Sequence, residues 1–153
     1  MSFADEWERE SQRAIQAQRE VVKVISIELF SGTITSSPVG NPSLWKNPNS
    51  APSGYTGGSF RSNWFLSYNA PSSETTESTE RGKALASSIA KEIEDGNYKG
   101  IYQLTNNLPY GPRLESGNWS QQAPNGIIAP NVMRVSSKIP AIEKIVNKKY
   151  GVD

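Results

Sequence analysis

The sequence predicts an α+β domain, in which an antiparallel sheet of three to five strands packs against a long N-terminal helix and one or two further helices. Two observations predict this class. Apolar residues recur at helical spacing near both ends of the chain, and they alternate at strand spacing in segments between the ends. A long stretch rich in proline, glycine and serine separates the first helix from the first strand. The chain of 153 residues suits one domain, residues 1–153.

Residues 1–30 are expected to form the long helix. Ser2 is a candidate N-cap, and Asp5 at the third helical position completes a variant of the capping box. Ser31-Gly32 marks the expected end. The run from residue 21 to 30 is rich in β-branched residues and also fits a strand, but the apolar stripe continues through it and favours a helix. The stripe consists of Phe3, Trp7, Ala14, Ala17, Val21, Val24, Ile25 and Leu29.

Residues 31–59 are expected to form an extended arm or loop. They hold four prolines and cannot form a regular element of any length. Trp45 and Tyr55 within them argue against a simple linker, because such side chains are stabilised by burial. Two interpretations stay open: an arm that docks on a neighbouring subunit, and a flexible surface loop.

Residues 60–153 are expected to form the core, with a C-terminal helix. The first strand has an apolar face and ends at Pro71, and a second strand is expected at residues 98–105 after the turn at residues 95–97. An amphipathic helix lies between the two strands. The residues on the strand face are Phe60, Trp64, Leu66 and Tyr68, and those on the helix are Ala84, Leu85, Ser88, Ile89 and Ile93.

Two arrangements stay open for residues 130–149. Pro130 can begin one helix that is kinked at Pro140. Alternatively, a strand near residues 132–135 precedes a helix that is capped by Ser136 or Ser137.

Composition excludes several classes of chemistry. The chain has no cysteine and no histidine, which rules out Cys/His zinc sites, His-ligated haem and His-dependent triads. The net charge is only +1, although residues 96–153 carry seven bases and three acids. The lysines near the C-terminus fit a solvated helix end better than a nucleic-acid stripe. No signal peptide is expected, and no apolar run approaches the ~20 residues of a membrane span.

The remaining reactive residue types match no catalytic pattern. Ser136-Ser137-Lys138 has the residue types of a Ser-Lys pair without a motif spacing. No glycine-rich segment has the spacing of a phosphate-binding loop. Glu115 is the most notable carboxylate, because it precedes the sharp turn at Ser116-Gly117. Its side chain fits an inter-subunit ion pair, a capping acceptor for backbone N–H groups, or a plain exposed side chain. We therefore predict no catalytic, cofactor-binding or metal-binding residues.

The most specific motif lies at residues 102–127: a strand, a turn, one helical turn led by Pro-Tyr, a glycine stop and a loop closed by Ala-Pro-Asn-Gly. With Gly-Gly-Ser-Phe-Arg-Ser-Asn-Trp before it, this order resembles the neck proteins of tailed bacteriophages, the tail-completion or minor tail components of the head–tail junction. The resemblance covers residues 55–135. It departs at Gly111-Pro112, where the family usually has alanine, and at Ser-Pro-Val 37–39, which lies about twenty residues from the glycine turn. The matching residues are Gly58, Phe60, Arg61, Trp64, Asn107, Pro109, Tyr110, Leu114, Glu115, Gly117, Ser120, Gln122, Ala123, Pro124 and Gly126.

The resemblance implies a structural virion protein, made in the host cytoplasm, and not an enzyme. Its expected partners are copies of itself, in a hexamer or dodecamer ring, a portal-side adaptor or head-closure protein, and a tail terminator or tail tube protein. DNA would pass transiently and without specificity, with no membrane and no cofactor involved. Because such rings pair unlike surfaces, the long helix and the arm are candidates for one surface and residues 106–127 for the other.

Other functions remain open beside this one. Within the same class, the protein is alternatively a tail terminator or a head-closure protein. From another class, it is a carboxylate-based cell-wall hydrolase with Glu115 as the acid. A third interpretation is a nucleic-acid-binding module that uses the C-terminal lysines.

Overall fold

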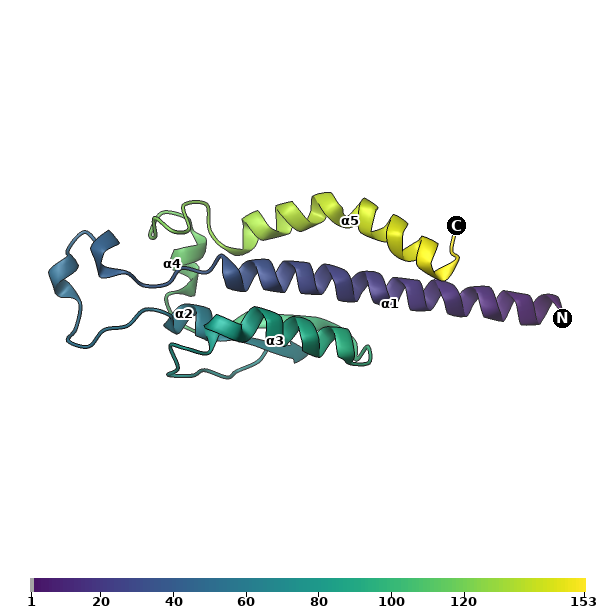
Figure 1. Cartoon of the computed structure of the whole chain (residues 1–153), viewed down its shortest axis with the longest axis horizontal. Helices are drawn as coiled ribbons and strands as arrows, with labels where there is room; N and C mark the ends of the chain where they lie inside the picture. Colours follow the sequence, from purple (N-terminus) through teal and green to yellow (C-terminus); the bar gives the residue numbers. More distant parts are fainter. Residues whose placement is uncertain (1) are drawn as a thin grey trace.

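A long helix, α1 (Phe3–Thr35), runs through most of the length of an elongated molecule (Figure 1). The computed structural model describes residues 2–153, and it confirms the α+β class and the long N-terminal helix. After α1 come two short 3-10 helices, η1 (Pro42–Leu44) and η2 (Pro48–Ser50), and then α2 (Ser59–Ser62), β1 (Trp64–Tyr68), α3 (Gly82–Asp95), β2 (Tyr102–Asn106), α4 (Gly111–Glu115) and α5 (Ile128–Tyr150).

Helix α1 begins as predicted and ends later than predicted. The Ser2 hydroxyl and the Asp5 carboxylate form the reciprocal capping box. The β-branched run is helical, but Ser31-Gly32 does not end the helix, which continues to Thr35. Gly32 lies inside α1, where the side-chain ends of Asn131 and Arg134 on α5 fill the space that a side chain at this position would take. The glycine marks a close helix–helix approach and not a helix end.

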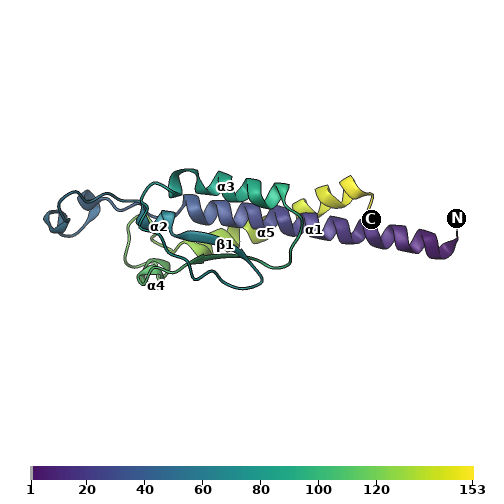
Figure 2. The ribbon, with the colours of Figure 1, turned by 90° about the horizontal axis from the view of Figure 1, so that it is seen from below.

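Helix α1 lies between two layers. Helix α5 covers one side of it, and α3 with the small sheet covers the other (Figures 1 and 2). A small apolar cluster of Ala17, Val21 and Val146 joins α1 to the C-terminal half of α5. The main core lies near the C-terminal end of α1 and consists of Phe30, Ile34, Phe60, Trp64, Leu85, Ile89, Ile93, Tyr102, Leu114, Ala123 and Ile127.

The sheet of the described residues has two antiparallel strands, so the expectation of three to five strands is not confirmed. β1 and β2 pair in register from Trp64 opposite Asn106 to Tyr68 opposite Tyr102. Phe60, which was expected to begin the first strand, belongs instead to α2. Its ring is buried from that helical turn, so its apolar character does not require a strand. The second strand also starts later than predicted, at Tyr102 and not at residue 98.

Helix α3 confirms one predicted helix, and α5 decides between the two arrangements left open for residues 130–149. The helix predicted near residues 84–93 is α3. Residues 130–149 lie in one helix, α5, with Pro140 inside it and no preceding strand. Pro140 is exposed, so the pyrrolidine ring points away from α1 and the buried contacts on either side of it are kept. No helix among residues 2–153 has the length and apolar character needed to span a membrane.

Ile34 tests where the stability of this fold resides. It is fully buried at the C-terminal end of α1. We expect Ile34→Ala to lower the free energy of unfolding by about 2–5 kcal/mol, because it leaves a cavity in the main core. The matched control is Ile101→Ala, whose side chain is 63% exposed, and it should change stability by no more than about 0.5 kcal/mol. Chemical denaturation followed by circular dichroism gives both values; equal effects would contradict this location of the core.

Candidate functional site

The residues that carry the family resemblance meet at one end of the molecule. There the C-terminal end of α1 lies beside the N-terminal end of α5, with α2 and α4 next to them (Figures 1 and 2). We call this region the junction and define it as residues 35–39, 58–64 and 106–131. The structure thus brings together two blocks of sequence that are more than forty residues apart.

Arg61 caps the C-terminal end of α1. That helix has no basic residue in its own last turn. The guanidinium of Arg61, on α2, donates to the carbonyl of Ser37 at 2.8 Å and to that of Thr35 at 3.0 Å. Carbonyls at a helix end lack intrahelical partners and carry the negative end of the helix dipole, so a cation from another element stabilises them.

Glu115 caps the N-terminal end of α5 with a negative charge, whereas Arg61 brings a positive charge to the C-terminal end of α1. This helix has no side-chain cap of its own and no acidic residue in its first turn. The carboxylate of Glu115, at the end of α4, accepts from the N–H of Ile128 at 2.6 Å and from that of Ile127 at 3.1 Å. Among the interpretations left open for Glu115, the capping acceptor is confirmed.

Gly126 makes room for this cap. Its φ of 87° lies in the left-handed region, which favours glycine. A side chain at this position would approach the carboxylate and the carbonyl of Glu115 to 2.5 and 2.6 Å. The Ala-Pro-Asn-Gly motif therefore brings the start of α5 onto the carboxylate.

An aromatic cluster supports both capping residues from inside. Phe60 contacts Trp64 edge to face, with ring centroids 5.6 Å apart, and Tyr110 at 5.8 Å. The indole N–H of Trp64 donates to the hydroxyl of Ser37 at 2.8 Å. Burial raises the pKa of Tyr110, and a hydrogen bond with Ser59 partly offsets this rise. Leu114 and Ala123 of the motif are also buried here, whereas Pro109 and Pro124 are exposed.

Gln122 ties the junction to the start of the arm. Its side-chain amide donates to the carbonyl of Val39 at 2.7 Å and accepts from the N–H of the same residue at 3.0 Å. Ser120 accepts from the backbone N–H of Gln122 at 3.2 Å and so helps to shape this loop. Gln122 thus satisfies both backbone groups of one residue 83 positions away.

The arm beyond Val39 has its own internal contacts. Its two ends meet at Gly40 and Gly57, where a side chain on Gly57 would collide with the carbonyl of Gly40. Within the arm, Trp45 and Tyr55 pack edge to face with ring centroids 5.1 Å apart. The arm projects away from the layers at the end of the molecule opposite the N-terminus (Figure 1). Docking of this arm on another subunit stays a prediction.

Asn63 and Arg81 contact the junction and were not among the predicted site residues, whereas Asn107 was. Asn63 is fully buried and bonds both backbone groups of Thr76, which fixes the loop after β1. Asn107, a motif residue, holds the same loop through the carbonyls of Ser72 and Glu74. The asparagines at the strand ends are the only signal that could have indicated these contacts. A further contact is that of Arg81, whose guanidinium donates to the carbonyls of Ser62 and Trp64.

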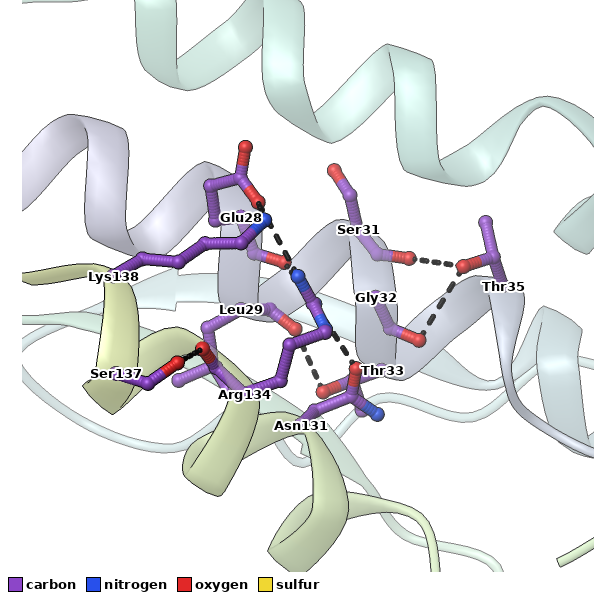
Figure 3. A network of polar contacts seen from close by, with 10 residues as sticks. All are labelled: Glu28, Leu29, Ser31, Gly32, Thr33, Thr35, Asn131, Arg134, Ser137 and Lys138. Atoms are coloured by element: carbon purple, nitrogen blue, oxygen red, sulfur yellow. Dashed lines mark hydrogen bonds and ion pairs between the residues drawn. The ribbon is translucent and has the colours of Figure 1, made fainter. Parts of the chain in front are cut away.

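An open groove of about 490 Å³ adjoins the junction between α1 and α5. Figure 3 shows its polar contacts: Glu28 accepts from both Arg134, at 3.4 Å, and Lys138, at 3.3 Å. Asn131 links the two helices by donating to the hydroxyl of Ser36 at 2.9 Å. The rest of the groove is lined by Ile27, Gly32 and the side chains of Ser31, Thr35 and Ser36, and the polar contacts join the two helices.

The described contacts of the junction anchor helix ends and loops. Ser137 next to Lys138 donates to the carbonyl of Arg134 within α5 and does not pair with the lysine. Residues 2–153 contain no cluster of acidic side chains that could hold a metal ion. The remaining motif glycines, Gly58 and Gly117, have φ values of 116° and 80° and shape turns. Comparisons of the chain with family models, with curated proteins and with solved structures found no match.

Removal of the Glu115 carboxylate tests its capping role. We expect Glu115→Ala to lower the free energy of unfolding by about 1–3 kcal/mol, because the first N–H groups of α5 lose their acceptor. Glu143→Ala is the control, since Glu143 is an exposed glutamate on the same helix, and it should cost at most about 0.5 kcal/mol. Urea denaturation of both variants measures the difference. Indistinguishable values for the two would contradict the capping role.

Gln122 allows a test of how the arm is held. In Gln122→Ala we expect amide hydrogen exchange at Val39 and through the arm to become faster, because the two-way bond to Val39 is lost. Gln121→Ala is a matched control, because Gln121 is the exposed neighbour in the same loop. Exchange measured by mass spectrometry should leave α1 and α3 unchanged in both variants. Arm exchange that is the same in the two variants would show that Gln122 does not hold the arm.

Proposed function

We propose that this chain is a structural subunit of the neck of a tailed bacteriophage. Copies form a ring of six, or of twelve, at the head–tail junction, join portal-side to tail-side proteins and line the channel through which DNA passes. The protein is made in the host cytoplasm and resides in the virion. The resemblance over residues 55–135 gives the proposal its family. The contacts within the subunit's own junction, residues 35–39, 58–64 and 106–131, give it physical support.

One observation carries the proposal: several motif residues hold helix ends and loops in place through contacts that are distant in sequence. Arg61 and Glu115 cap two helices from a distance, and Gln122 fixes the base of the arm. These contacts fix the direction of the arm and of α5. A fixed direction suits a subunit that neighbouring subunits must contact at defined positions. An enzyme would instead converge reactive groups on a pocket.

The shape of the subunit also favours assembly in a ring. The arm lies at one end of an elongated molecule and the start of α1 lies at the other (Figure 1). These ends differ in sequence and in shape. Contacts between unlike surfaces repeat by rotation and can close into a ring, whereas a self-complementary surface gives a dimer.

No structural observation favours the alternatives over this proposal. A tail terminator or a head-closure protein would belong to the same class and use the same features. For a hydrolase, Glu115 would have to act as an acid, yet its oxygens accept backbone N–H groups of α5. For nucleic-acid binding, Lys144 and Lys148 would have to supply the basic surface, because Lys138 and Lys149 pair with Glu28 and Glu20.

Immunogold electron microscopy of purified particles tests the proposed location. With an antibody against this chain, we expect label confined to the head–tail junction. Peptide mass spectrometry of the same particles should detect the chain in a small fixed number of copies. Particles that lack both the label and the peptides would contradict the neck role, and label along the tail or over the capsid would contradict the position.

A further inference from the structure

The first turns of α1 form an exposed helical tip, which we define as residues 3–14. The apolar stripe of α1 is covered by α5 from Ala17 onward, where Ala17 and Val21 pack against Val146. The same stripe continues to Phe3 and Trp7, which are 82% and 66% exposed. The tip therefore continues an existing helix–helix interface past the end of α5, and the C-terminal residues Gly151, Val152 and Asp153 lie beside its inner part.

The tip has the features of a surface that is covered by a partner. A helical segment of this length is marginal in water by itself, so packing of an amphipathic face normally stabilises it. Two large apolar side chains at its end are costly to leave in water. The tip also carries four acids and two bases, which gives it a net negative charge.

The outer face of α5 is complementary to this tip. It lies on the side of the helix opposite the buried residues Val135 and Val146. Helix α5 carries five bases and one acid. Lys144 and Lys148 on the outer face form no ion pair within residues 2–153. The outer face consists of the exposed residues Met133, Ser137, Pro140, Ala141, Lys144 and Lys148.

We propose that the tip of one copy docks on the outer face of α5 of a second copy. Phe3 and Trp7 would pack against the apolar part of that face at the exposed residues Pro140 and Ala141. Glu6, at the edge of the tip's stripe, and Glu10, within it, would lie near the two free lysines. This contact gives the proposed neck ring its subunit interface, and to that extent the inference rests on the proposed function.

The contact joins two unlike surfaces, which decides how it repeats. Each copy keeps one free tip and one free outer face after it has bound a neighbour. Its own α5 cannot receive its own tip, because α1 and α5 already pack along their inner faces. Repetition therefore leads to a closed ring or to a filament.

Engineered disulfides test this contact cleanly, because the chain has no cysteine. Two variants are mixed and oxidised: Ala4→Cys in the tip and Ala141→Cys on the outer face of α5, one of them carrying a mass tag. Both alanines are exposed, so each substitution is mild. We expect a mixed disulfide dimer to form severalfold more than with the control variant Ala84→Cys, an exposed position on α3.

Two results would overturn the proposal. One is a yield of the mixed dimer no higher than that of the Ala4→Cys and Ala84→Cys pair. The other is a predominance of tip-to-tip dimers, which would indicate a self-complementary contact. Either result leaves the neck role standing, because that role is judged from labelled particles and not from the contact used.

Charge reversal tests the ionic part of the same contact. In the cross-linking assay, Glu6→Lys with Glu10→Lys in the tip copy should lower the yield of mixed dimer severalfold. Lys144→Glu with Lys148→Glu in the other copy should restore it. A yield that stays low when both copies are reversed would contradict the pairing of these groups, as would a yield that neither reversal changes.

Discussion

Two helix ends that carry no adequate caps of their own meet at the junction, and the rest of the structure depends on how they are satisfied. The C-terminal end of α1 receives Arg61, and the N-terminal end of α5 receives Glu115. Because the two helices are antiparallel, opposite ends of their dipoles lie side by side, and each attracts a charge of opposite sign. Since the capping residues lie on α2 and α4, the ends of the long helices are satisfied only with these short helices packed in place.

The position of the arm follows from the same constraint. Arg61 bonds to the carbonyl of Ser37, and Trp64 donates to the hydroxyl of that residue. Gln122 then holds Val39, the next contact along the chain. The arm therefore leaves the junction in a direction set by residues of both motif blocks. In this way α2 and the loop that holds Gln122 set the direction of the arm, which fits the proposed assembly role.

Much of the fold was predictable because its determinants are local. The capping box at Ser2 and the apolar stripe specify α1, and the period of α3 is plain in the sequence. The errors came from contacts that are distant in sequence. Gly32 resembles a helix end by itself, and only the approach of α5 explains it. Phe60 resembles a strand residue, and its packing in the main core, which includes contacts with Trp64 and Tyr110, explains why a helical turn buries it.

The junction was predictable only in part, for the same reason. The motif indicated which residues matter, and Glu115 was a candidate capping acceptor, but no local pattern gives the target of Arg61 or of Gln122.

A double-mutant cycle on Arg61→Met and Glu115→Ala tests the central claim, that both helix ends are stabilised as one unit. We predict a coupling free energy of at least about 0.5 kcal/mol, because Asn131 and Ser36 connect the two sites. Effects that add to within about 0.3 kcal/mol would show two independent caps and contradict the claim.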